Sequence, residues 1–120
     1  MSDTAPPIVL VIVTSDPRTS PRPAEAVRIA AGVAAWKKAI VRLHFQGPAV
    51  LCLSEFPDEL MDEDNFTRYL PLLGDTGHPV TVESGSVHLT ELGEAPVPFE
   101  EADASALSTL VAQATSVMRF

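Results

Sequence analysis

Six consecutive apolar residues near the start of the chain, Ile8 to Val13, constrain the fold more than any other sequence feature. A strand without polar residues is buried on both faces, as happens when helices cover both sides of a parallel sheet. The run passes directly into Thr14-Ser15-Asp16-Pro17 and then into a helical pattern. We therefore predict an α/β protein with a three-layer, mainly parallel sheet, whose ligand site lies where the strands end.

The rest of the chain alternates between helical and extended patterns, and no linker divides it. We predict helices over residues 24–38 and 103–118, a further helix after the acidic stretch 55–64, and strands over 40–46, 79–83 and 97–99. Residues 1–7 are expected to form a loose arm. A length of 120 residues with 46% hydrophobic residues fits a single domain over residues 1–120.

The predicted strand 40–46 differs in kind from the first strand because its apolar residues alternate with Arg42, His44 and Gln46. Alternation with a period of two is typical of a strand that has one buried and one exposed face. We therefore expect this strand at the edge of the sheet or at an interface, with His44 on its polar face.

The acidic balance of the chain excludes two classes of partner. Sixteen acidic residues against eight basic ones give a formal net charge of −8, which repels nucleic acids and anionic membrane surfaces. The apolar run 8–13 is also too short to span a bilayer. Cys52 is the only cysteine, so no internal disulfide can form, and we expect a cytoplasmic protein.

The candidate ligand-binding residues follow strands at the predicted carboxyl end of the sheet. The loop after the first strand combines hydroxyl, carboxylate and guanidinium groups in front of a helix, which suits an anion. Because this loop has no glycine to wrap a phosphate, the alternative is a rigid capped turn whose arginines pair with acidic neighbours. The predicted set is Thr14, Ser15, Asp16, Arg18, Ser20, Gln46, Glu83 and Ser84.

The single thiol is the alternative reactive group. Cys52 lies within the apolar segment Val50-Leu51-Cys52-Leu53, and no basic residue is near it in the sequence. A thiol in apolar surroundings stays protonated, whereas the thiolate is the nucleophile. We therefore interpret Cys52 as a core residue and assign no catalytic residue, with Cys52 as the alternative.

No spacing of residues indicates a metal site or a catalytic triad. The histidines are scattered, and the acidic stretch lacks the alternating pattern of a calcium-binding loop, so we predict no metal and no cofactor. Glu83, Ser84 and His88 are expected near Asp16 and Arg18 at the carboxyl end of the sheet. The G-x-S-x-G signature of a hydrolase nucleophile is absent.

The order of elements resembles the DsrE/DsrF-like family of small α/β proteins, which includes sulfur-relay subunits. The matching residues are 8–17, 21–39, 41–45 with Gly47-Pro48-Ala49-Val50, and 70–82. The resemblance implies a flavodoxin-like parallel sheet and homo- or hetero-oligomers such as trimers and hexamers. Sulfur-carrying members have a cysteine just after the third strand, where this chain has Glu83-Ser84-Gly85.

These observations lead to one main hypothesis and two alternatives. We expect a cytoplasmic, oligomeric module that binds a small ligand, an anion or another protein, and that lacks the sulfur-carrier cysteine. The first alternative is a sulfurtransferase or persulfide carrier acting through Cys52, which requires an accessible thiol of low pKa. The second is a subunit that acts only when a sulfur-relay partner supplies the thiol.

Overall fold

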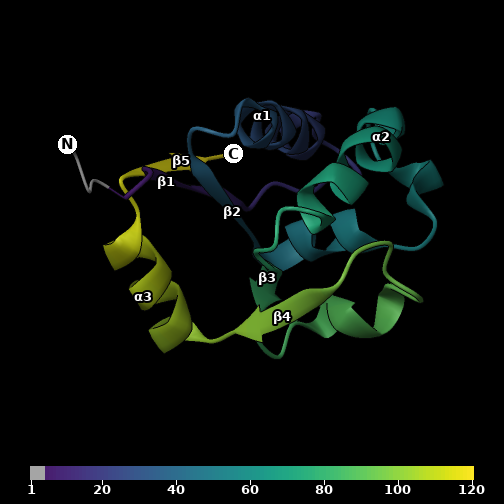
Figure 1. The fold of residues 1–120 in the computed structure, drawn as a ribbon. Coiled ribbons are helices and arrows are strands. Elements are labelled where there is room, and N and C mark those ends of the chain that lie inside the picture. The colour runs from purple at the N-terminus through teal and green to yellow at the C-terminus, as the bar shows by residue number, and fades with distance from the viewer. Residues whose placement is uncertain (1–4) are drawn as a thin grey trace.

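The computed structural model describes residues 5–120 and contains one five-stranded parallel sheet (Figure 1). Residues 1–4, part of the arm predicted over residues 1–7, lie outside the described residues. The strands are β1 (Ile8–Val13), β2 (Ile40–Phe45), β3 (Val80–Glu83), β4 (Phe99–Ala102) and β5 (Ser116–Arg119). They lie in the order β4-β3-β2-β1-β5, and every neighbouring pair is parallel. The predicted parallel α/β class is confirmed.

The helices are divided unequally between the two faces of the sheet. They are α1 (Arg22–Trp36), α2 (Glu63–Gly74) and α3 (Ala104–Gln113), with short 3₁₀ helices η1 (Gly47–Leu53), η2 (Pro57–Glu59) and η3 (Val87–Glu91). Figure 1 shows α1 and α2 together on one side and α3 alone on the other. The chain runs from β1 to β4 in one direction across the sheet, and α3 returns it to the far side of β1. Among the described residues, no helix combines the length and apolarity needed to cross a membrane.

The main hydrophobic core lies between the sheet and the side that carries α1 and α2. Phe45 and Phe66 are among its largest buried side chains, and they pack in one cluster with residues of β1, α1 and η1. Buried alanines on α1 have no bulk to hold the helix away, so α1 approaches the strands closely. The buried alanines of α1 are Ala24, Ala26, Ala30 and Ala31.

The prediction of β2 as an edge strand is wrong, because β2 lies between β1 and β3 in the interior of the sheet. Its alternation has a different cause. Leu43 and Phe45 face the main core, whereas Arg42 and His44 lie on the opposite face, beside Leu10 and Ile12 of β1. The polar residues of β2 therefore lie on the side of the sheet that carries α3.

The C-terminal helix predicted over residues 103–118 is shorter in the structure. It ends at Gln113, and β5 continues the sheet beside β1. Thr115 anchors the new strand: its backbone amide donates to the Ile8 carbonyl at 2.8 Å, and its hydroxyl accepts from the Ile8 amide at 3.0 Å. The fourth strand also differs from its predicted range of 97–99, because Val97 is buried in the core and pairing starts at Phe99.

Candidate functional site

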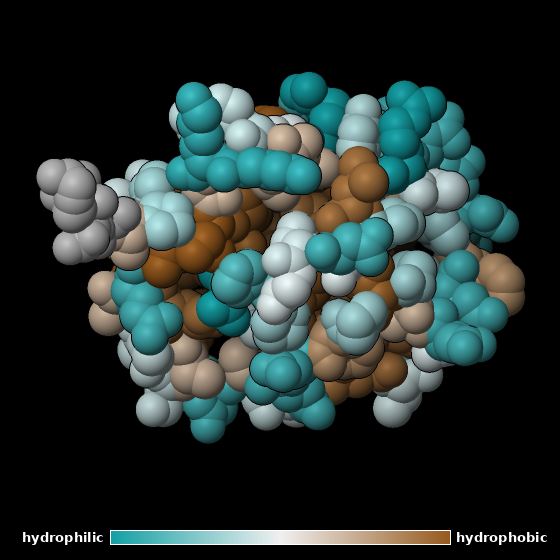
Figure 2. Space-filling model, viewed as in Figure 1, coloured by the Kyte–Doolittle hydropathy of each residue, from teal (hydrophilic) through white to brown (hydrophobic). Residues whose placement is uncertain are grey.

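A cleft of about 400 Å³ opens where β2, β3 and β4 end and α3 begins. We call it the α3 cleft. Figure 2 shows the surface hollowed between α3 and the sheet, in the view of Figure 1. Three residues of the predicted set, Gln46, Glu83 and Ser84, line the cleft. The remaining lining residues are His44, Ala102, Asp103, Ala104 and Leu107.

His44 forms the buried polar floor of the α3 cleft. Its side chain is 1% exposed, and its Nδ1 lies 2.8 Å from the Thr81 hydroxyl oxygen. The Thr81 hydroxyl donates to the Leu43 carbonyl at 3.3 Å, and on this ground we assign the imidazole proton to Nδ1, which makes Nε2 an acceptor. Burial lowers the pKa of His44, and the nearby Glu83 carboxylate partly opposes this change. His44 is therefore neutral, and the expectation that it faces solvent is wrong.

Two carboxylates stand at the mouth of the α3 cleft, and each has a structural role. Glu83 accepts a hydrogen bond at 3.3 Å from the amide of Gly47, which begins η1 with a φ of 57°. Asp103 caps α3, accepting from the Ala106 amide at 2.8 Å. Each bond uses one carboxylate oxygen. Within the described residues, Oε2 of Glu83 and Oδ2 of Asp103 accept no hydrogen bond.

The loop after β1 does not line the α3 cleft, and its charges neutralise each other. Arg18 Nη2 lies 2.9 Å from Asp16 Oδ2, while the Arg18 Nε and backbone amide donate to Asp16 Oδ1. Arg18 thereby lowers the pKa of Asp16. The amides of Thr14 and Ser15 donate to the Phe120 carbonyl at 2.9 and 3.3 Å. The cationic and amide donors that an anion would require are thus already bound within the chain.

The hydroxyl of Ser20 is also bound within this loop, where it accepts from the Arg22 amide at 3.2 Å. Ser20 therefore stabilises the start of α1, as in the capped-turn alternative. Arg22 in turn donates from Nη2 to the Arg119 carbonyl at 3.3 Å. The predicted set is consequently divided between a cleft and a self-contained turn.

Cys52 lies on η1, inside the core, with an exposed fraction of 0%. Burial raises its pKa well above the ordinary value, so the thiol stays protonated. A small apolar cavity of about 270 Å³ adjoins Cys52, with walls that include Phe66 and Leu70. A backbone hydrogen bond lowers the pKa of Cys52, but burial outweighs it.

The geometry does not bring a hydrolase triad together. His88 Nδ1 lies 2.6 Å from Glu91 Oε2, so this imidazole is paired within η3 and not with Ser84. Within residues 5–120 there is also no group of three or more His, Cys, Asp or Glu side chains placed to hold a metal ion.

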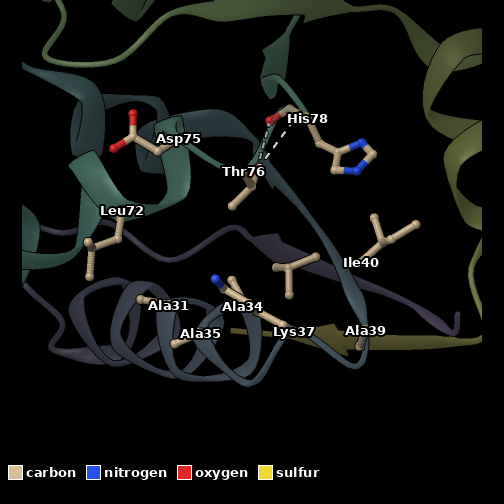
Figure 3. A pocket seen from close by; sticks show the side chains of 11 residues that line it. Ala31, Ala34, Ala35, Lys37, Ala39, Ile40, Leu72, Asp75, Thr76 and His78 are labelled. Carbon is tan, nitrogen blue, oxygen red and sulfur yellow. Dashed lines mark hydrogen bonds between the residues drawn. The ribbon is translucent and has the colours of Figure 1, made fainter.

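A second, larger cavity of about 560 Å³ lies at the opposite end of the strands, between the last turns of α1 and α2 (Figure 3). Its α1 wall consists largely of alanines, which offer no hydrogen bonds. The Thr76 hydroxyl at its rim is already used within its own turn, donating to the Leu73 and His78 carbonyls. No residue of the predicted set lines this cavity, and we base the candidate site on the α3 cleft.

Sequence reasoning missed five lining residues of the cleft, namely His44, Ala102, Asp103, Ala104 and Leu107. The alternation along β2 predicts an exposed polar face, whereas His44 on that face is buried beneath the cleft. Asp103 carried a usable signal, since an aspartate directly before an apolar helical pattern is a common N-cap. Leu107 belongs to the first turns of the helix that follows.

Comparisons with known proteins agree with this architecture. The model of the DsrE/DsrF-like family matches residues 8–120. Among solved structures, the crystal structure of the YchN protein from E. coli aligns with a TM-score of 0.76 and 16% identity, covering 95% of this chain and 99% of that chain. The likeness confirms the predicted DsrE-like, flavodoxin-like fold. No curated protein matches the chain.

Proposed function

The chain belongs to the DsrE/DsrF-like family, and from this premise we propose a non-catalytic module that binds a small ligand in the α3 cleft. One observation carries the proposal: a buried, neutral His44 presents a free acceptor nitrogen to a concave site lined by Gln46, Glu83 and Ser84. A concave site with a few convergent polar groups and a titratable residue of shifted pKa is typical of ligand binding.

Two features support a binding role over persulfide transfer. The position after β3, where sulfur-carrying members have a cysteine, holds Ser84 and Gly85. A persulfide forms on a thiolate that a donor can reach, whereas Cys52 is fully buried and its pKa is raised. A relation to sulfur-relay proteins therefore does not make this chain a carrier.

The competing carrier function is tested by intact mass after incubation with a sulfur donor, beside a Cys52→Ala control. We expect no gain in mass, and we expect iodoacetamide to alkylate Cys52 only in denaturant. A gain of one sulfur atom that reductant removes, and that the variant lacks, would establish the carrier function and overturn our proposal.

The binding role itself is tested by screening small organic fragments while the NMR signals of His44 and Gln46 are followed. We expect saturable shifts that Leu107→Trp abolishes by filling the cleft, with the fold checked by circular dichroism. If no fragment moves these signals, the binding proposal fails.

We further propose that the protein is a cytoplasmic homo-oligomer. Its support is the number of large apolar side chains at the surface: Trp36, Phe56 and Val87 are 62%, 71% and 80% exposed. Both edge strands, β4 and β5, also have an unpaired side. Light scattering coupled to size exclusion measures the assembly, and a monomer at micromolar concentration would contradict this proposal.

A further inference from the structure

The polar groups that line the α3 cleft can accept hydrogen bonds, and few of them can donate. His44 Nε2 and the carboxylates of Glu83 and Asp103 are acceptors only. Gln46 and Ser84 offer both kinds of group. A ligand that fits this lining must therefore bring its own donors.

The position of His44 directs this requirement to one nitrogen atom. The residue is 1% exposed, Nδ1 is bound to Thr81, and no hydrogen bond to Nε2 occurs among the described residues. Nε2 is therefore left to water or to a ligand in the cleft, and a donor group on the ligand can bond to it directly.

The charged side chains that line the cleft are all acidic. The lining includes two carboxylates and no lysine or arginine. Arg18, the cation of the predicted set, is paired with Asp16 outside the cleft. Arg42 lies on the same face of β2 but closer to its start, and it does not line the cleft. A positively charged ligand is therefore favoured over an anion.

The opposite wall of the cleft is apolar, with Ala102, Ala104 and Leu107 from β4 and α3. A volume of about 400 Å³ admits a short aliphatic chain against this wall. A hard metal ion would instead need six or more oxygen ligands, which two carboxylates and one amide do not supply. The lining suits a ligand with an apolar stem and a cationic head.

Resting on the proposed binding function, we infer that the α3 cleft binds a small aliphatic amine in its ammonium form. The ammonium donates to His44 Nε2 and to the free oxygens of Glu83 and Asp103. Its stem lies against Leu107. An ammonium has three donors and no acceptor, which complements a lining rich in acceptors.

The test compares three probes of equal stem length: butylammonium chloride, butanol and sodium butyrate, at constant ionic strength. The readout is the NMR signal of the His44 imidazole in the full chain. We expect a saturable shift with butylammonium alone. Glu83→Gln keeps an oxygen for the Gly47 amide, so the fold is retained, but its loss of charge should weaken binding about tenfold.

The matched control is Glu94→Gln, which removes one negative charge from an exposed residue outside the cleft. We expect it to change the affinity less than about twofold, because exposed charges are screened. Equal weakening by both variants would reduce the effect to net charge and overturn the inference.

The remaining outcomes separate the amine inference from the binding function on which it rests. Saturable binding of butanol or butyrate as strong as that of butylammonium would overturn the amine class and leave a binding cleft in place. Failure of all three probes would also overturn the inference, while the fragment screen independently decides whether the cleft binds anything.

Discussion

The two faces of the sheet are built from the same strands and differ in what they bury. On the side of α1 and α2, apolar residues of β2 such as Phe45 pack into one continuous cluster. On the side of α3, β2 presents Arg42 and His44, and none of the ten residues of α3 is buried. The comparison indicates that the side of α1 and α2 supplies the main apolar core, while the side of α3 holds polar groups beneath a thinner cover.

The lengths of the elements explain the difference. Ten residues give α3 a length of about 15 Å, while the four steps from β4 to β5 span about 19 Å. A single helix of that length leaves part of the face uncovered. The opposite face carries two helices and η1, which cover more of it and leave the cavity of about 560 Å³ between the last turns of α1 and α2 (Figure 1).

The largest expected loss of stability follows from a substitution in the core on the side of α1 and α2. Phe45 is 0% exposed, so Phe45→Ala removes a buried ring and leaves a cavity. We expect a loss of about 3–5 kcal/mol in the free energy of unfolding, measured by urea denaturation. This is a large part of the total stability of a small domain.

Phe45→Leu serves as the companion variant if Phe45→Ala fails to fold. It retains most of the apolar volume and should cost less than the alanine variant. A loss below 1 kcal/mol for Phe45→Ala would show that the α1 and α2 face is not the main source of stability.

A smaller effect is expected from the buried polar pair on the other face. Thr81→Val keeps the shape of the side chain but removes the oxygen that His44 Nδ1 contacts. The buried imidazole then lacks a partner, and we expect a loss of about 1–3 kcal/mol in the free energy of unfolding. Thr109→Val, on exposed α3, is the matched control and should change stability less. Equal losses in the two variants would argue against a buried histidine bond.

The pH dependence of the free energy of unfolding tests the buried His44 on the side of α3. Burial lowers the pKa of His44 below its ordinary value of 6.5. Below that pH the unfolded chain binds the proton first, so the free energy of unfolding falls as the pH falls towards the folded-state pKa. Urea titrations between pH 7 and pH 5 should show this slope in the native protein and a smaller slope in His44→Gln. An identical slope in both proteins would contradict it.

The sequence predicted the side of α1 and α2 better than the side of α3. The apolar run of β1 and the small residues of α1 report burial directly, because both depend on local hydrophobicity. The position of β2 within the sheet could not be predicted. Alternation of polar and apolar residues occurs both in strands with one solvent-exposed face and in strands with one face in a polar cleft beneath a helix. The strand character of residues 116–119 depends on pairing with β1, more than a hundred residues away in sequence.

The same distinction applies to the candidate site. Gln46, Glu83 and Ser84 were expected together because parallel strands end at one side of a sheet, and they line one cleft. The loop that holds Asp16 and Arg18 allowed two interpretations from the sequence, an anion site or a turn in which the two side chains form an ion pair. Only atomic geometry distinguishes the two, because the answer depends on side-chain rotamers.

The smallest expected effect concerns α3 itself. Leu107 is only partly buried and lines the cleft, so Leu107→Ala removes few packing contacts. We expect a loss below about 1 kcal/mol in the free energy of unfolding, in contrast to the loss at Phe45. Urea denaturation of the two variants side by side gives the comparison. A loss of 2 kcal/mol or more at Leu107 would mean that α3 packs firmly on the sheet, and the cleft beneath it would then be too closed to admit a ligand.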